Sequence, residues 1–116
     1  MRDGKIIGRG HNQRVQKGSA TLHGEMDCLM NAGRQTCYQD TVIYSTLSPC
    51  MMCSGTIVQF KIPRVVVGEA VNFSGAPDFL RSHGIEVEVL NQPDLIAMMG
   101  DFIRVRPELW NEDISE

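Results

Sequence analysis

Four residues of the types that bind metals or move protons stand at two places in the chain: His23 with Glu25, and Cys50 with Cys53. Cysteines three residues apart lie on one face of a helix. Pro49 is expected as the first helical residue, because its missing N–H costs nothing there. A helix N-terminus favours the thiolate form. With His23, the two thiolates predict a zinc site that has three protein ligands and one open position, as catalytic zinc does.

Glu25 follows His23 by two residues, so it lies near the predicted metal without being needed as a ligand. The combination H-x-E with P-C-x-x-C is the known signature of zinc-dependent nucleoside and nucleobase deaminases. In such a site zinc lowers the pKa of its water to about 7. Glu25 would take the water's proton, pass it to a ring nitrogen and later protonate the departing amine. The sequence therefore predicts a hydrolase with one zinc ion per chain.

Composition narrows the class of protein. A length of 116 residues predicts one domain over 1–116. The net charge is −3 and no basic run occurs, which disfavours long nucleic acid as a partner. No stretch has the roughly 20 apolar residues of a membrane span, and no signal peptide opens the chain. We expect a cytoplasmic protein, with the nucleus as an alternative location. Cys28 and Cys37 are expected to be structural.

The order of the predicted elements indicates an α/β fold. Residues 41–47 are rich in β-branched types and residues 64–68 are continuously apolar, so both predict strands. A helix ending near Phe60 separates them, which predicts a right-handed parallel crossover. The remaining elements are expected to be a helix over 22–32, a short helix over 77–83, an edge strand over 85–90 and a helix from Pro93.

The beginning of the chain suggests a missing element. Asp3-Gly4 is a hairpin turn signal, and Lys5–Gly8 would be the strand that follows it. No strand precedes the turn. We expect that the chain is N-terminally truncated relative to its fold.

Five segments resemble fungal cytosine deaminases: Gly8–Asn12 (GRGHN), Gln16–Glu25 (QKGSATLHGE), Thr46–Cys50 (TLSPC), Val67–Phe73 (VGEAVNF) and Trp110–Ile114 (WNEDI). The resemblance spans nearly the whole chain. It implies a three-layer α/β/α fold with a mixed sheet, assembled as a homodimer. It also implies hydrolysis of cytosine to uracil and ammonia in pyrimidine salvage, with action on 5-fluorocytosine. That family has a helix and a strand before the Asp-Gly turn.

The resemblance also implies a set of substrate-binding residues: Asn12, Gly24, Leu47, Ser48, Phe73, Trp110 and Asp113. The Asn12 side chain and the Gly24 backbone would bind the pyrimidine edge. Leu47 and Ser48 would line the pocket beside the metal. Phe73 and Trp110 would close over the ring, and Asp113 would help to position the substrate or the closing tail.

Other interpretations of the same residues remain. The enzyme could act on guanine or on another small base or nucleoside. The chain could instead be a truncated, non-catalytic pseudo-deaminase whose zinc is structural. A redox role for Cys50 and Cys53 would leave His23 and Glu25 unexplained. Because a missing strand exposes a sheet edge, we also expect this chain to be unstable or weakly active.

Overall fold

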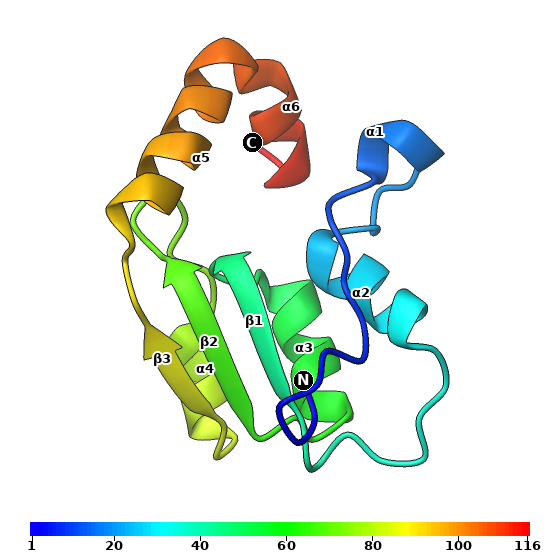
Figure 1. Cartoon of the computed structure of the whole chain (residues 1–116). Coiled ribbons are helices and arrows are strands. Elements are labelled where there is room, and N and C mark those ends of the chain that lie inside the picture. The colour runs from blue at the N-terminus through cyan, green and yellow to red at the C-terminus, as the bar shows by residue number, and fades with distance from the viewer.

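The computed structural model describes residues 1–116 and shows helices packed on a small sheet (Figure 1). The strands are β1 (Val42–Leu47), β2 (Arg64–Glu69) and β3 (Glu86–Val89). The helices are α1 (Arg14–Lys17), α2 (Gly24–Ala32), α3 (Met51–Gln59), α4 (Pro77–Ser82), α5 (Pro93–Val105) and α6 (Pro107–Asp113). This order confirms the predicted α/β fold. None of the helices combines the length and the apolar character that a membrane span requires.

The sheet has the strand order β1-β2-β3, and both pairings are parallel. Ile43 lies opposite Val65, which lies opposite Val87. The predicted parallel crossover through α3 and the predicted edge strand are both confirmed. All three strands therefore end at the same edge of the sheet, where α5 and α6 arch over the tips of β1 and β2 (Figure 1).

The core lies between one face of the sheet and the helices α3 and α4. Val65 and Val67 of β2 are fully buried there, against Ile57 of α3 and Leu80 of α4. Burying a side chain of this size contributes about 1.5–3 kcal/mol relative to leaving it exposed. These contacts fix the position of α3, whose first turn carries the cysteine pair.

The expectation of a strand over Lys5–Gly8 was wrong. Asp3 and Gly4 do form a tight turn, with φ of 50° and 74°, but only an isolated antiparallel bridge between Arg2 and Lys5 flanks it. A strand needs a neighbour for its backbone hydrogen bonds. The outer edge of β1 offers one such bonded pair, between Val42 and Met1. The sheet is consequently parallel throughout, and the expected mixed pairing is absent.

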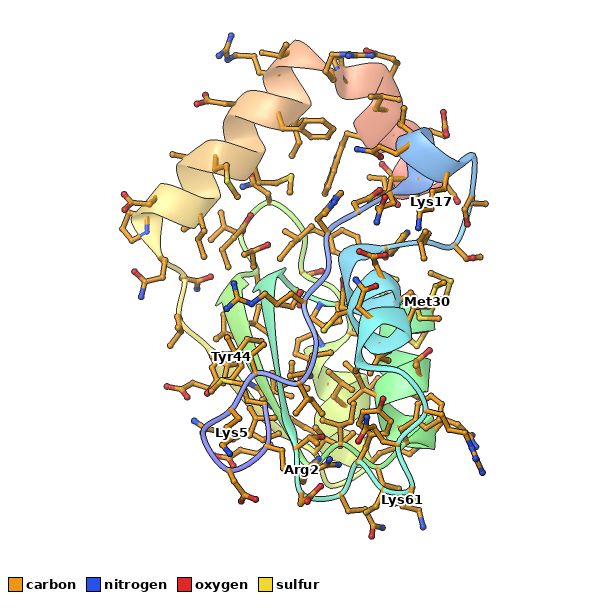
Figure 2. All side chains as sticks on the ribbon, turned by 45° about the vertical axis from the view of Figure 1, so that its right-hand side comes forward. Arg2, Lys5, Lys17, Met30, Tyr44 and Lys61 are labelled. Carbon is orange, nitrogen blue, oxygen red and sulfur yellow. The ribbon has the colours of Figure 1, made fainter.

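The third layer of the expected α/β/α arrangement is only partly present. On the face opposite α3, Leu95 of α5 packs against the backbone at Gly68, where an added Cβ would lie 2.4 Å from Leu95 Cδ1. Further along this face no helix covers β1. Tyr44 projects there with 57% of its surface exposed (Figure 2).

Candidate metal centre and active site

The predicted metal ligands meet near the carboxyl ends of β1 and β2. Open α/β sheets place their ligand sites in this position, because the connecting loops diverge there. The backbone N–H of Ser48 donates to the Glu69 carbonyl at 3.0 Å, which holds the start of the cysteine loop against the end of β2.

His23 is the N-cap of α2, with φ −66° and ψ 166°, and Glu25 is the second residue of the helix. The extended backbone at His23 lets two side chains that are two residues apart point to the same place. The prediction that both residues lie at the irregular start of the helix is confirmed.

Cys50 is the N-cap of α3, and its sulfur accepts a hydrogen bond from the Cys53 backbone N–H at 3.5 Å. Pro49 thus lies before the cap, and the expectation that it is the first helical residue was wrong. Cys50 takes the capping position because its sulfur can accept from the first turn, which proline cannot do. The cysteines still lie in the first turn of α3, as predicted.

Nδ1 of His23 lies 3.5 Å from Cys50 Sγ and 3.7 Å from Cys53 Sγ. A tetrahedral zinc ion with bonds of about 2.3 Å to sulfur and about 2.0 Å to nitrogen places these ligands about 3.5 Å apart. The three residues therefore fit zinc. They are the only group of three or more His, Cys, Asp or Glu side chains in the chain that converge closely enough to hold a metal ion.

No fourth protein ligand joins this group. Cys28 is half-buried and its sulfur lies 3.3 Å from the Gly8 carbonyl oxygen. Cys37 is exposed and lies beside Gln39. The position that a structural site would fill with a side chain is left for water or substrate.

The three candidate ligands share protons in the metal-free protein. The hydrogen bond from Cys53 lowers the pKa of Cys50 to about 4, and the His23 imidazole stabilises the thiolate further. Hydrogen bonds to Asp113 and to Cys50 raise the pKa of His23 to about 10. The bond to Cys50 also raises the pKa of Cys53. A soft divalent cation would displace these shared protons, since thiolate and neutral imidazole are its preferred ligands.

Glu25 lies beside the sulfur pair and is half-buried. Burial raises the pKa of its carboxyl group, and the nearby Cys50 thiolate raises it further. A raised pKa makes a carboxylate a better proton acceptor, which suits a group that moves protons next to a metal site.

Asp113 meets His23 on the side away from the cysteines. Its Oδ1 lies 2.7 Å from His23 Nε2, so Nδ1 is the nitrogen left for the metal. Asp113 Oδ2 also accepts from Asn12 Nδ2 at 3.1 Å. The structure thus joins the N-terminal loop, the start of α2 and the end of α6 around the histidine.

The remaining predicted pocket residues make contacts within the N-terminal loop, at the end of β1 and between the loop after β2 and α6. Gly24 lies against the backbone of Asn12, and Leu47 ends β1 directly before Ser48. Ser48 is buried, and its hydroxyl donates to the Ser74 carbonyl at 2.9 Å. Phe73 and Trp110 make an edge-to-face contact, with ring centroids 6.0 Å apart. Of the seven predicted pocket residues, Asp113 contacts a candidate metal ligand directly, and the substrate-binding role of all seven stays a prediction.

Two charged residues that position the site, Arg14 and Asp27, were not predicted. Arg14 donates to Glu112 at 2.9 Å and so holds α6 against the N-terminal loop. Asp27 accepts from His11 N at 3.1 Å and from Gln13 Nε2 at 3.0 Å, which fixes that loop on α2. No sequence pattern distinguishes them from ordinary surface charges, because each acts on a partner that only the fold brings near.

Comparison with known proteins shows the family to which the chain belongs. The model of the cytidine and deoxycytidylate deaminase zinc-binding region matches residues 1–69, which include His23, Glu25, Cys50 and Cys53. The chain belongs to this deaminase family. The family match agrees with the zinc geometry of His23, Cys50 and Cys53.

Two relatives of this deaminase-family chain show how far the similarity extends. A cytosine deaminase of Candida albicans is 51% identical over 98% of the chain and 77% of its own length. A tRNA-specific adenosine deaminase of Streptococcus pyogenes is 39% identical over 90% of the chain and 73% of its own length. The predicted resemblance to fungal cytosine deaminases is therefore confirmed.

Solved structures share the fold. A tRNA deaminase of the wobble position aligns with a TM-score of 0.61 at 25% identity, covering 78% of each chain. A dCMP deaminase from the cyanophage S-TIM5 aligns with a TM-score of 0.55 at 25% identity, covering 78% of this chain and 75% of its own. The fold class of this family member is thus that of known deaminases.

Proposed function

We propose that the chain hydrolyses cytosine to uracil and ammonia, with zinc bound by His23, Cys50 and Cys53. One observation carries the substrate assignment: 51% identity over 98% of the chain to a cytosine deaminase. The three converging ligands with no fourth side chain support hydrolytic rather than structural zinc.

In the proposed reaction the metal ligands, Glu25 and Asp113 have separate roles. His23, Cys50 and Cys53 would hold zinc, which would act as a Lewis acid and make hydroxide available near neutral pH. Glu25 takes the proton from the attacking water and passes it to the ring nitrogen. It then takes the second proton from the hydroxyl group added to the ring carbon and gives it to the departing amine, so that water and cytosine become uracil and ammonia. Asp113 holds His23 in the orientation that keeps Nδ1 turned towards the sulfurs.

The pocket residues bind the base in this proposal. The Asn12 amide and the Gly24 backbone carry donors and acceptors that match a pyrimidine edge. Leu47 and Ser48 line the side nearest the metal. Phe73 and Trp110 cover the ring, and their edge-to-face contact supports a shared role. Action on 5-fluorocytosine follows if the pocket tolerates a substituent as small as fluorine.

The test compares zinc content and ammonia release for the wild type and for Glu25→Ala. We expect the variant to keep one zinc per chain and to lose at least about 100-fold in turnover, because proton transfer by a positioned group contributes about 10²–10⁴-fold. Glu86→Ala, at an exposed position on β3, is the matched control and should keep full turnover. Loss of zinc together with activity in Glu25→Ala would contradict the shuttle role.

Ammonia release from cytosine, cytidine, guanine and adenosine decides the substrate. If ammonia is released faster from cytidine, guanine or adenosine than from cytosine, that compound is the substrate instead of cytosine. Zinc binding without release from any of them would identify the chain as a non-catalytic relative.

We further propose a homodimer that works in pyrimidine salvage in the cytoplasm. Exposed apolar side chains on α2 and α3 support self-association: Met30, Met51 and Met52, with Phe60 directly after α3. Thiolate ligands require a reducing compartment. Sedimentation analysis should give twice the chain mass, and a monomer at micromolar concentration would reject the dimer.

A further inference from the structure

Glu69 is the last residue of β2, and its side chain is buried with only 1% of its surface exposed. It forms no ion pair with any lysine, arginine or histidine of the chain. A buried carboxylate is costly unless hydrogen bonds satisfy it. The hydrogen-bond partners of Glu69 therefore identify the part of the structure that this carboxylate stabilises.

Those partners all belong to the loop that follows β2. Glu69 Oε2 accepts from the backbone N–H groups of Val71 at 2.9 Å and of Asn72 at 3.0 Å. Glu69 Oε1 accepts from Asn72 Nδ2 at 2.9 Å. Three donors on two oxygens fix both the path of the backbone and the side chain of Asn72.

Asn72 carries the connection on to α5. Its Nδ2 also donates to the Ile96 carbonyl at 2.9 Å. Nearby, Ala70 N donates to Asn91 Oδ1 at 3.0 Å, just before α5 begins. The first half of the loop is thus tied to Glu69 on one side and to the start of α5 on the other.

The second half of the loop is tied to the cysteine loop. Ser48 Oγ donates to the Ser74 carbonyl at 2.9 Å, and Ala76 N donates to the Pro49 carbonyl at 3.2 Å. Phe73 is the residue between the two sets of ties. It meets Trp110 of α6 edge to face, with ring planes at 87°.

We propose that Glu69 is a positioning residue, which sets Phe73 against Trp110 and thereby determines how tightly the aromatic pair holds the substrate. The inference rests on the proposed function, in which these two rings cover the base. Glutamine has the same shape as glutamate but cannot replace it here. One oxygen would become an NH₂ group, and that donor would face a donor from Val71 or Asn72.

The experiment uses Glu69→Gln, with Glu86→Gln on the exposed side of β3 as the matched control. We expect the KM for cytosine to rise about tenfold in Glu69→Gln, which corresponds to about 1.4 kcal/mol. The kcat should change by less than about twofold, since the metal and Glu25 are untouched. Zinc content should stay at one per chain.

Trp110 is the only tryptophan, so its fluorescence gives a second readout that does not depend on turnover. Acrylamide should quench it more strongly in Glu69→Gln than in the wild type or the control, because the Phe73 ring no longer packs against it. In the Phe73→Ala background, Glu69→Gln should raise KM little further, as residues acting through one contact are not additive.

The outcomes separate this inference from the proposed function. Turnover of cytosine with an unchanged KM and unchanged quenching in Glu69→Gln would overturn the positioning role and leave the function standing. No turnover by the wild type would overturn the function, while the quenching comparison would still decide the role of Glu69. If Glu69→Gln does not fold, Asn72→Ala at a half-buried loop position removes the two side-chain bonds of Asn72 Nδ2, to Glu69 Oε1 and to the Ile96 carbonyl, and keeps the backbone bonds to Glu69 Oε2. Acrylamide should also quench Trp110 more strongly in Asn72→Ala than in the wild type. Unchanged quenching in this variant would overturn the inference.

Discussion

At the scale of single residues, the two nitrogens of His23 have separate tasks. Nδ1 faces the two sulfurs at 3.5 and 3.7 Å, and Nε2 faces Asp113 Oδ1 at 2.7 Å. A carboxylate on the far nitrogen fixes the tautomer and the ring orientation, and it makes the near nitrogen a stronger ligand. Asp113 therefore contributes to the metal site from the opposite end of the chain.

Replacing Asp113 should weaken the metal site without removing a ligand. We expect Asp113→Asn to bind zinc about 10–100-fold more weakly, as is typical for loss of such a partner. Competition with a chromogenic chelator measures the change. Asp101→Asn, on the exposed side of α5, is the control and should leave zinc affinity unchanged. Equal affinity in both variants would show that Asp113 does not support the histidine.

At the scale of elements, the N-terminal loop reaches the site because it runs against the backbone of α2. A Cβ added at Gly10 would lie 2.3 Å from Cys28 N, so only glycine allows this approach. The carboxylate of Asp27 then holds His11 N, directly before Asn12. Close packing and one buried acceptor together place the predicted substrate-binding amide.

Gly10→Ala should therefore displace the loop from α2. We expect a loss of about 1–3 kcal/mol in the free energy of unfolding, as for other overpacked positions. Gly55→Ala is the matched control, because an added Cβ there meets no atom within 4 Å. In the middle of α3 it should stabilise the protein by up to about 1 kcal/mol. Urea unfolding followed by circular dichroism checks both, and equal midpoints would refute the packing argument.

At the scale of the whole molecule, the outer edge of β1 is open. Val42 bonds to Met1, but Tyr44 and Thr46 have no backbone partner on that side. Tyr44 also lies on the sheet face that α5 leaves uncovered. An unpaired edge with an exposed aromatic side chain invites pairing with another chain.

The open edge predicts low stability and association at high protein concentration. Tyr44→Lys should reduce light scattering on heating, because a lysine on an edge strand opposes intermolecular pairing. Val15→Lys, which adds the same charge on the exposed helix α1, is the control and should scatter like the wild type. A cooperative melt of the wild type without scattering would show that the edge is harmless.

The sequence predicted those elements that form through interactions between neighbouring residues, and it failed where an element needs a partner from elsewhere in the fold. The elements from α2 to α5 follow local signals, such as the β-branched run of β1, the apolar run of β2 and the alternation in β3. The strand expected at Lys5–Gly8 failed because a strand also needs a neighbour, which no local pattern supplies. The expectation for Pro49 failed because the Cys50 sulfur competes for the capping position.

The sequence alone determined which residues could bind zinc. The types and spacing of His23, Cys50 and Cys53 predict the zinc ligand set, and Glu25 next to His23 is the proposed proton shuttle, since each pair lies within one helical turn. The tertiary structure decided everything that depends on distant segments meeting. It placed Asp113 behind His23, Phe73 against Trp110, and Glu69 beneath the loop that carries Phe73. Such contacts join residues far apart in the chain, and only packing around the parallel sheet brings them together.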